Sequence, residues 1–258
     1  MRKVVVSGST INSGQLVDLL RKAVQGGPVT FENFQYYLED PNRFAAPEQT
    51  SLDRAIRLLG VEKVVTAQQW GEVWGREVVE TEAGVLKFNQ GVLQSAADTN
   101  KAGFTDFRIV YYGGTSLREG HQIFGTDKSV QPCYWKDSTW WLGSENDWAT
   151  HQPKTGYYLL DYKLRFRNMK WQSQENEIAK LGNGYSRAHE TVVTEGAFSF
   201  YKVHNGERLL EKEYHWGRSS DSDGYRVRVG FFLADGWDVS GLQPGFSRDY
   251  LGVVVARN

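Results

Sequence analysis

Apolar residues near the N-terminus recur every three or four positions, which is the spacing of one face of a helix. The sets with this spacing are Leu16, Leu19, Leu20 and Ala23; Phe31, Phe34, Tyr37 and Leu38; and Leu52, Ala55, Ile56 and Leu59. Each set is followed by residues that end helices, namely Gly26-Gly27-Pro28, Asp40-Pro41 and Gly60. We therefore expect a small helical N-terminal region over residues 1–68.

After Val64 the pattern changes to short extended runs, such as residues 84–88 and 107–112, separated by glycine and polar turns. This pattern predicts a turn-rich β region that continues to about residue 150. Within it, residues 134–148 are rich in tryptophan. So aromatic a stretch either packs under a second layer or presents a binding platform, and packing is the favoured use.

The order of elements is clearest from residue 156 onward. The pattern predicts a strand at 156–164, helices at 173–181 and 186–201, a turn at Asn205-Gly206, and strands at 208–216, 225–233 and 251–256. The last of these strands is an unbroken apolar run, so we expect it to be central and buried. Strand, helix, helix and then strands is the order of an α+β fold.

Composition excludes several classes of protein. The formal net charge of -1 gives no general attraction for nucleic acid or an anionic membrane. Cys133 is the only cysteine, so neither an internal disulfide nor a cysteine-rich zinc site can form. No run of residues matches a secretory signal or a membrane span. We expect a cytoplasmic or virion-associated protein.

Catalytic and metal-binding patterns are also lacking. The five histidines, His121, His151, His189, His204 and His215, lie in no nucleophile motif and have no helix-face metal spacing. Two acidic turns, residues 145–147 and 221–224, hold the oxygen ligands that calcium prefers, but we expect both to be solvated turns. The basic and aromatic run at residues 163–171 lies among acidic residues, which disfavours nucleic acid. We expect no enzyme activity, cofactor or metal.

Part of the chain resembles a known family. The resemblance is carried by Trp171 and the segments at residues 174–182, 187–190, 206–210, 215–217 and 251–257. Over roughly residues 155–258 the chain is similar to the variable proteins of diversity-generating retroelements, which have a C-type-lectin-like fold. In that family a reverse transcriptase copies a template repeat with errors at adenines and overwrites the 3′ end of the gene.

The resemblance implies two helices packed on short strands, and we expect the whole C-type-lectin-like domain to span residues 69–258. A Trp-rich insertion would lie at about residues 115–155, and a diversified C-terminal segment would span residues 216–258. In that segment, structural residues such as Val227 and Val229 alternate with a mixed polar and aromatic set, and alternation places neighbours on opposite faces of a strand.

The mixed set also has the composition of a recognition surface, with aromatic anchors among adaptable polar residues. The predicted ligand-binding residues are Arg218, Asp221, Asp223, Tyr225, Arg226, Arg228, Phe232, Leu233, Asp235, Trp237, Asp238, Ser240, Leu242, Gln243, Phe246, Ser247, Arg248, Asp249 and Tyr250. For Phe231 or Phe232, and for Trp237 and Phe246, a place in the core is an equal alternative.

The leading hypothesis is a non-catalytic protein whose hypervariable surface binds a protein or cell-surface ligand, with the N-terminal region as a possible means of oligomerisation or attachment to a larger assembly. The alternative is a carbohydrate-binding lectin of fixed specificity that stacks sugars on Trp141 or Trp237. A formylglycine-generating type of enzyme, whose fold is related, needs paired cysteines that this chain lacks.

Overall fold

The computed structural model describes residues 51–78 and 86–257. These residues belong to one compact unit. The helices predicted at residues 16–23 and 31–38, and the extended run predicted at 84–88, lie wholly or partly outside the described residues. Residues 51–68, assigned above to the N-terminal region, form part of the same compact unit as the rest.

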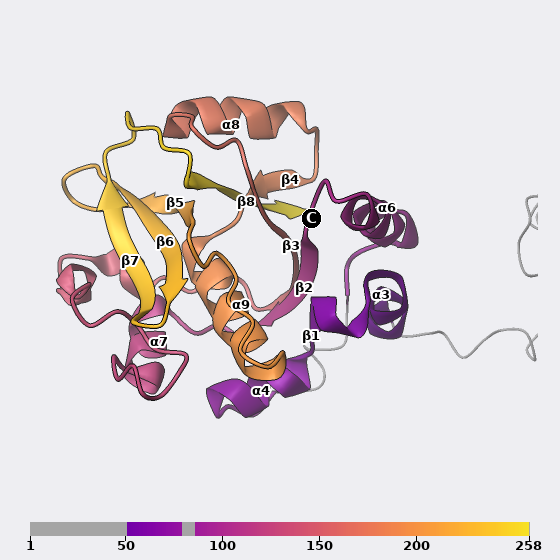
Figure 1. Cartoon of the computed structure of the whole chain (residues 1–258), viewed down its shortest axis with the longest axis horizontal. Coiled ribbons are helices and arrows are strands. Elements are labelled where there is room, and N and C mark those ends of the chain that lie inside the picture. The colour runs from indigo at the N-terminus through magenta and orange to yellow at the C-terminus, as the bar shows by residue number, and fades with distance from the viewer. Residues whose placement is uncertain (1–50, 79–85, 258) are drawn as a thin grey trace, which may run out of the picture. The chain divides into compact units, whose positions relative to one another are not determined.

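The described residues form one mixed sheet of eight strands, so the predicted α+β class is confirmed (Figure 1). The strands are β1 (Val64–Val65), β2 (Phe107–Tyr112), β3 (Gly156–Arg165), β4 (Tyr185–Arg187), β5 (Tyr214–Ser220), β6 (Arg226–Leu233), β7 (Gly236–Leu242) and β8 (Leu251–Arg257). Their order is β1-β2-β3-β8-β5-β6-β7, and β4 also pairs with β8.

Strand β8 joins the two halves of the sheet. It runs antiparallel to β3, with Leu160 opposite Ala256, and parallel to β5, with Tyr214 opposite Leu251. Its residues are buried from Leu251 to Ala256, as expected of an apolar strand with neighbours on both edges. The prediction that the last strand is central and buried is confirmed.

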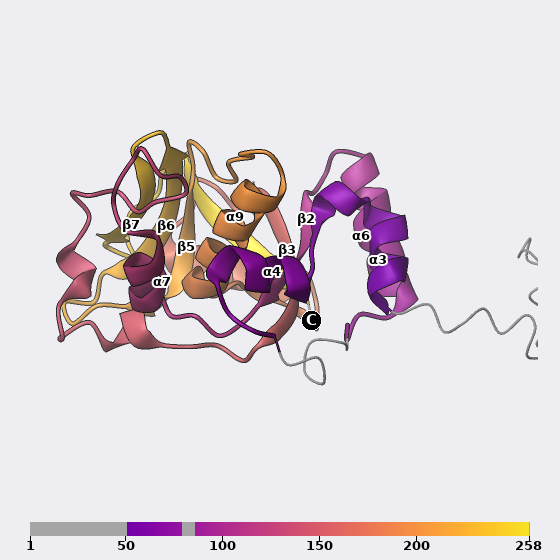
Figure 2. The ribbon, with the colours of Figure 1, turned by 90° about the horizontal axis from the view of Figure 1, so that it is seen from below.

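Six α-helices lie within the described residues: α3 (Ser51–Leu59), α4 (Ala67–Trp74), α6 (Gln90–Lys101), α7 (Leu117–Phe124), α8 (Trp171–Lys180) and α9 (Glu190–Val203). The predicted helices at 52–59 and 173–181 correspond to α3 and α8. Figure 2 shows α3 and α6 side by side at one end of this unit and α7 near the opposite end.

The predicted turn-rich β region between residues 64 and 150 is wrong in part, because it contains α4, α6 and α7, whereas the extended run predicted at 107–112 is confirmed as β2. Capping explains two of these helices. Thr66 with Gln69, and Ser116 with Glu119, form capping boxes in which each side chain bonds the backbone N–H of the other. These polar cap residues resemble turn residues in the sequence, which hid the helix starts.

Boundaries also differ farther along. The helix predicted at 186–201 is divided into β4 and α9, because His189 has extended backbone and caps α9 by accepting from Thr191 N. Strand β5 begins at Tyr214 rather than residue 208. Strand β7 was missed because its glycines and polar residues interrupt the apolar alternation.

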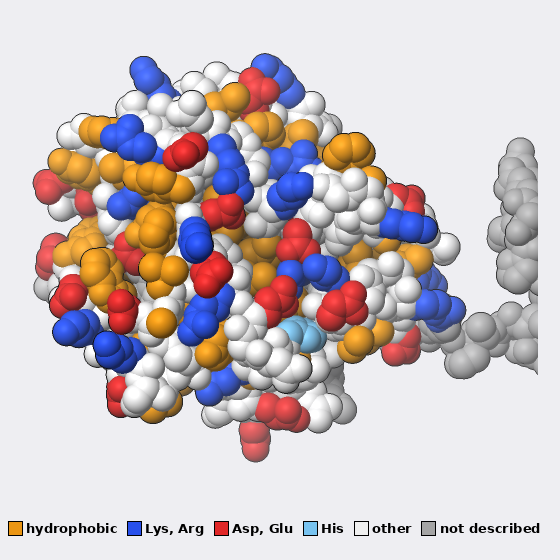
Figure 3. Space-filling model, viewed as in Figure 1, with side chains coloured by type: hydrophobic (Ala, Val, Ile, Leu, Met, Phe, Trp, Pro, Cys, Tyr) orange, Lys and Arg blue, Asp and Glu red, His pale blue; other side chains and the backbone are white. Residues whose placement is uncertain are grey.

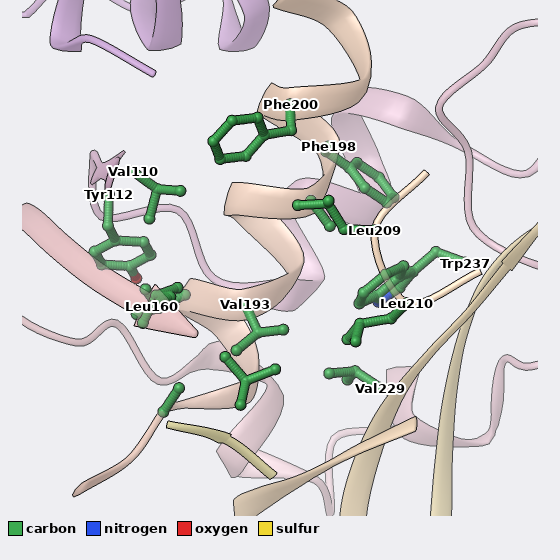
Figure 4. Packing of buried hydrophobic residues seen from close by; sticks show 14 of the residues in the cluster. Val110, Tyr112, Leu160, Val193, Phe198, Phe200, Leu209, Leu210, Val229 and Trp237 are labelled. Atoms are coloured by element: carbon green, nitrogen blue, oxygen red, sulfur yellow. The ribbon is translucent and has the colours of Figure 1, made fainter. Parts of the chain in front are cut away.

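Helix α9 forms the centre of the core, and its residues from Glu190 to Phe200 are buried. In Figure 4 it lies between Val110, Tyr112 and Leu160 on one side and Leu210, Val229 and Trp237 on the other. Both halves of the sheet therefore pack against one helix, which fixes the position of β5, β6 and β7 relative to β2 and β3.

Candidate functional site

Strands β6 and β7 have one face in the core and one face directed outward. Val227 and Val229 of β6 and Val239 of β7 belong to the main core cluster. Their neighbours Arg226 and Arg228 lie opposite Leu242 and Ser240 in the register of the two strands, and all four are partly exposed. We call the outward side of β5, β6 and β7 the outer face, together with the residues packed on it. Its members are Trp171, Tyr214, Arg226, Arg228, Phe231, Ser240, Leu242 and Tyr250.

A bulge in β6 sets which phenylalanine joins this face. Gly230 has φ 145°, and a Cβ there would lie 2.1 Å from the carbonyl oxygen of Glu213, so only glycine fits. The register with β7 shifts between Gly230 and Leu233. As a result Phe231 stacks on Tyr214 at 4.7 Å between ring centres, and Phe232 enters the core.

Aromatic rings hold the two arginines of β6. The guanidinium carbon of Arg226 lies 3.9 Å from the ring centre of Trp171, and that of Arg228 lies 4.2 Å from the ring centre of Tyr214. Arg228 also donates to Ser240 Oγ at 3.3 Å. Both side chains are therefore fixed while part of each remains exposed.

Tyr214 anchors the face from beneath. Its hydroxyl donates to Asp238 Oδ2, and burial followed by the nearby Asp238 carboxylate raises the pKa of Tyr214. Asp238 itself is 5% exposed, so it supports Tyr214 rather than contacting solvent. Its assignment to the binding surface is corrected for that reason.

Two further predicted site residues, Phe232 and Trp237, are 0% exposed and belong to the core. Phe232 stacks on Phe198 of α9 at 5.6 Å, and Trp237 Nε1 donates to Thr194 Oγ1 at 3.1 Å. Their assignment to a ligand surface is wrong, because the bulge at Gly230 turns Phe232 inward and α9 supplies the partners of both rings.

The other predicted residues lie in four places. Arg226, Arg228, Ser240, Leu242 and Tyr250 are on the outer face. Gln243, Phe246, Ser247, Arg248 and Asp249 are in the loop between β7 and β8. Arg218, Asp221, Asp223 and Tyr225 are at the end of β5 and in the turn to β6. Leu233 and Asp235 are at the β6–β7 hairpin.

Three outer-face residues, Trp171, Tyr214 and Phe231, were missed as site residues. The Gly230-Phe231-Phe232 sequence was the available signal for Phe231, since a glycine inside a strand marks a bulge. Trp171 begins α8 and Tyr214 begins β5, and nothing in the local pattern indicates that either meets β6. Figure 3 shows hydrophobic side chains interspersed with charged ones over the region of β6 and β7.

The Trp-rich stretch is partly buried, as expected of packing, and partly exposed. Tyr134 and Trp141 are buried in the core, whereas Trp135 and Trp140 are each 39% exposed. Backbone bonds between Trp135 N and Trp237 O, and between Trp237 N and Cys133 O, cover the free edge of β7. Trp140 packs against Trp148 at 5.7 Å and donates to Val239 O.

The acidic turn at Asp221 is stabilised by its own backbone. Asp221 Oδ1 accepts from Asp223 N at 3.0 Å and from Tyr225 N at 2.8 Å, which is an Asx turn. Within residues 51–78 and 86–257 no three His, Cys, Asp or Glu residues are placed to hold a metal ion.

Four of the five histidines contact backbone or one another, and His121 lies against the rings of Tyr134 and Trp141. His215 Nε2 donates to Ala188 O at 3.1 Å, and its Nδ1 accepts from Val254 N at 3.0 Å. Burial lowers the pKa of His215 well below its usual value, so the ring is neutral and links β5, β8 and the start of α9. His151 and His189 stack at 4.9 Å.

The outer face offers aromatic planes, guanidinium donors and hydroxyl groups, all of which are groups that contact ligands in protein binding sites.

Comparison with protein-family models, curated proteins and solved structures found no match for this chain. Among the described helices, none combines the length and apolar character that crossing a bilayer requires.

Proposed function

We propose that this chain is a non-catalytic ligand-binding protein of the retroelement-diversified kind, with a C-type-lectin-like scaffold and a binding surface on the outer face and the loop at residues 243–250. The observation that carries this proposal is the division of β6 and β7. Arg226, Arg228 and Ser240 are directed outward, while Val227, Val229 and Val239 are fixed in the core.

A scaffold that tolerates a changing surface needs its stability elsewhere. Here the inward residues of β6 and β7 pack on α9, whose side chains are almost all buried, and β8 is buried along its length. Substituting an outward residue leaves these contacts in place, and surface substitutions away from special features change stability little. The arrangement of two helices, α8 and α9, with short strands and a closing β8 supports the lectin-like part of the proposal.

The test is to sequence the DNA around the gene. We expect a near-copy of the segment that encodes residues 216–257, with mismatches at adenines of the copy, and a reverse transcriptase gene beside it. The mismatched codons should include those of Arg226, Arg228 and Ser240 and should spare Val227 and Val229. Mismatches that fall equally on codons of inward and outward residues, or no repeat at all, would contradict the part of the proposal that concerns diversification.

A lectin of fixed specificity is the second candidate, and Trp140 favours it. The two tryptophans first considered for sugar stacking, Trp141 and Trp237, are 0% exposed, so neither can contact a sugar. Trp140 is exposed beside Trp148, and the Asp221 carboxylate and Tyr225 lie near it around Gly241. An aromatic plane beside a carboxylate suits a sugar ring.

This second candidate predicts binding to glycans on an array. The binding should be lost in Trp140→Ala and kept in Arg226→Gln, which changes the outer face alone. The absence of any array signal, or a signal that is equal in Trp140→Ala and the unmodified protein, would dismiss it.

A further inference from the structure

Several arginines of this chain have no ion-pair partner among the described carboxylates, and Arg226 and Arg228 of the outer face are among them. In the described residues the arginines that form ion pairs with carboxylates are Arg76, Arg108, Arg165, Arg167 and Arg187. Arg226, Arg228 and Arg248 form no ion pair with any described carboxylate, and they contact Arg218 O, Ser240 Oγ and Ser247 O respectively. Arg226 and Arg228 therefore carry positive charge on the outer face with no described carboxylate in salt-bridge contact.

Arg226 and Arg228 are also placed for a paired interaction. They are two residues apart on one face of β6, so their Cα atoms are roughly 7 Å apart along the strand. Because each guanidinium is already held over a ring, at 3.9 Å for Trp171 and 4.2 Å for Tyr214, little side-chain freedom remains to be lost on binding. A stacked guanidinium donates in its own plane, so the N–H groups that do not bond Arg218 O or Ser240 Oγ remain to bind a carboxylate.

Apolar surface lies directly beside these cations. Phe231 and Tyr250 pack edge to face at 6.0 Å, both are partly exposed, and Leu242 lies opposite Arg226 in the register. A ligand that covers the outer face must therefore present carboxylates to the arginines and an apolar side chain to the rings.

We propose that the outer face of this chain binds an acidic segment of a protein, with two of its carboxylates on Arg226 and Arg228 and an apolar side chain on Phe231 and Tyr250. This inference rests on the proposed function and specifies the partner's chemistry.

The surrounding charges favour a protein over a polyanion. Asp223 is exposed in the turn between β5 and β6, and Asp249 is exposed in the loop before β8. Glu213 lies immediately before β5. With a formal net charge of -1, the chain as a whole has no general attraction for a long run of phosphates or sulfates, whereas a few carboxylates among apolar residues fit between these acids.

The experiment is selection of a random-peptide phage library on the purified full-length protein. Parallel selections use the double variant Arg226→Gln/Arg228→Gln and a matched control, Arg54→Gln/Arg57→Gln, which removes two arginines from α3. We expect enriched peptides to hold more Asp and Glu than the input library. A synthetic copy of the most enriched peptide should bind the face variant at least about tenfold more weakly than the control, and should bind more weakly as salt rises.

A further variant, Phe231→Ala/Tyr250→Ala, distinguishes failure of the acidic inference from failure of the outer face as a binding surface. The melting curve of each variant shows that it folds. If peptides lose affinity with this variant but not with Arg226→Gln/Arg228→Gln, the face binds and the acidic inference fails. If they depend on neither pair, the proposed surface fails as well. Binding of heparin or duplex DNA that is stronger than that of the peptides and depends on Arg226 and Arg228 would also overturn a protein partner.

Discussion

Glu195 is a carboxylate in the middle of α9 that is 1% exposed. Its oxygens accept hydrogen bonds from the backbone N–H groups of Gly113 and Thr115, at 2.7 and 3.2 Å. Burial raises the pKa of Glu195 to about 8 against the lowering effect of these bonds. The residue ties the loop after β2 to the central helix, and it does so in protonated form at neutral pH.

A dependence of stability on pH follows. An unfolded Glu titrates near 4.5, so between this pH and about 8 the folded chain binds a proton that the unfolded chain has lost. The free energy of unfolding should therefore fall as pH rises across that window, by on the order of 3 kcal/mol. Glu195→Gln cannot ionise and should lack this part of the slope. Urea denaturation of both proteins from pH 5 to pH 8 measures it, and parallel profiles would contradict the assignment.

At the scale of elements, the β6–β7 hairpin is held at its edge by the segment at residues 133–135. Gly236 has φ 116°, and a Cβ on it would lie 2.7 to 2.8 Å from backbone atoms of Cys133, Tyr134 and Trp135. The close approach lets Trp237 exchange two backbone bonds with this segment, and so places β7 with no open edge at that point.

Gly236→Ala should therefore weaken the whole hairpin. Positive φ and overlap with backbone each cost about 1–3 kcal/mol, and together should lower the free energy of unfolding by at least about 2 kcal/mol. Gly245→Ala is the matched control, because a Cβ there meets nothing within 4 Å and its φ is not positive. Urea denaturation compares the two, and losses of equal size would show that the edge contact contributes nothing.

At the scale of the whole molecule, the compact unit begins before α3. Strand β1 pairs in parallel with β2, with Val64 opposite Ile109, and Ala55 and Leu59 of α3 share a core cluster with Phe107. Residues 51–68 thus complete one edge of the sheet and cover part of one face.

Two truncated chains test this. Both lack residues 1–49, and the shorter one begins at Gln69 and so also lacks α3 and β1. The chain that begins at Thr50 should unfold cooperatively. The shorter chain should have a lower urea midpoint and a free energy of unfolding that is smaller by several kcal/mol, since burial of each large aliphatic residue contributes about 1.5–3 kcal/mol. Equal midpoints would mean that the sheet does not need this edge.

By itself the sequence determined what depends on near neighbours along the chain. The helical spacing at 52–59, the apolar run of β8 and the alternation of Val227 and Val229 with Arg226 and Arg228 follow from the 3.6-residue and two-residue periods of helices and strands. These patterns were enough for the α+β class and for the outward assignment of Arg226, Arg228, Ser240 and Leu242.

Only the tertiary structure decided which aromatic residues are buried. Phe232 and Trp237 enter the core because α9, more than thirty residues earlier in the chain, supplies their partners. Phe231 faces outward because the backbone of Glu213 lies against Gly230. Trp171 and Tyr214 join the same face through contacts with Arg226 and Arg228 that no local pattern records. Burial depends on which distant segments meet, and local periodicity carries no information on those meetings.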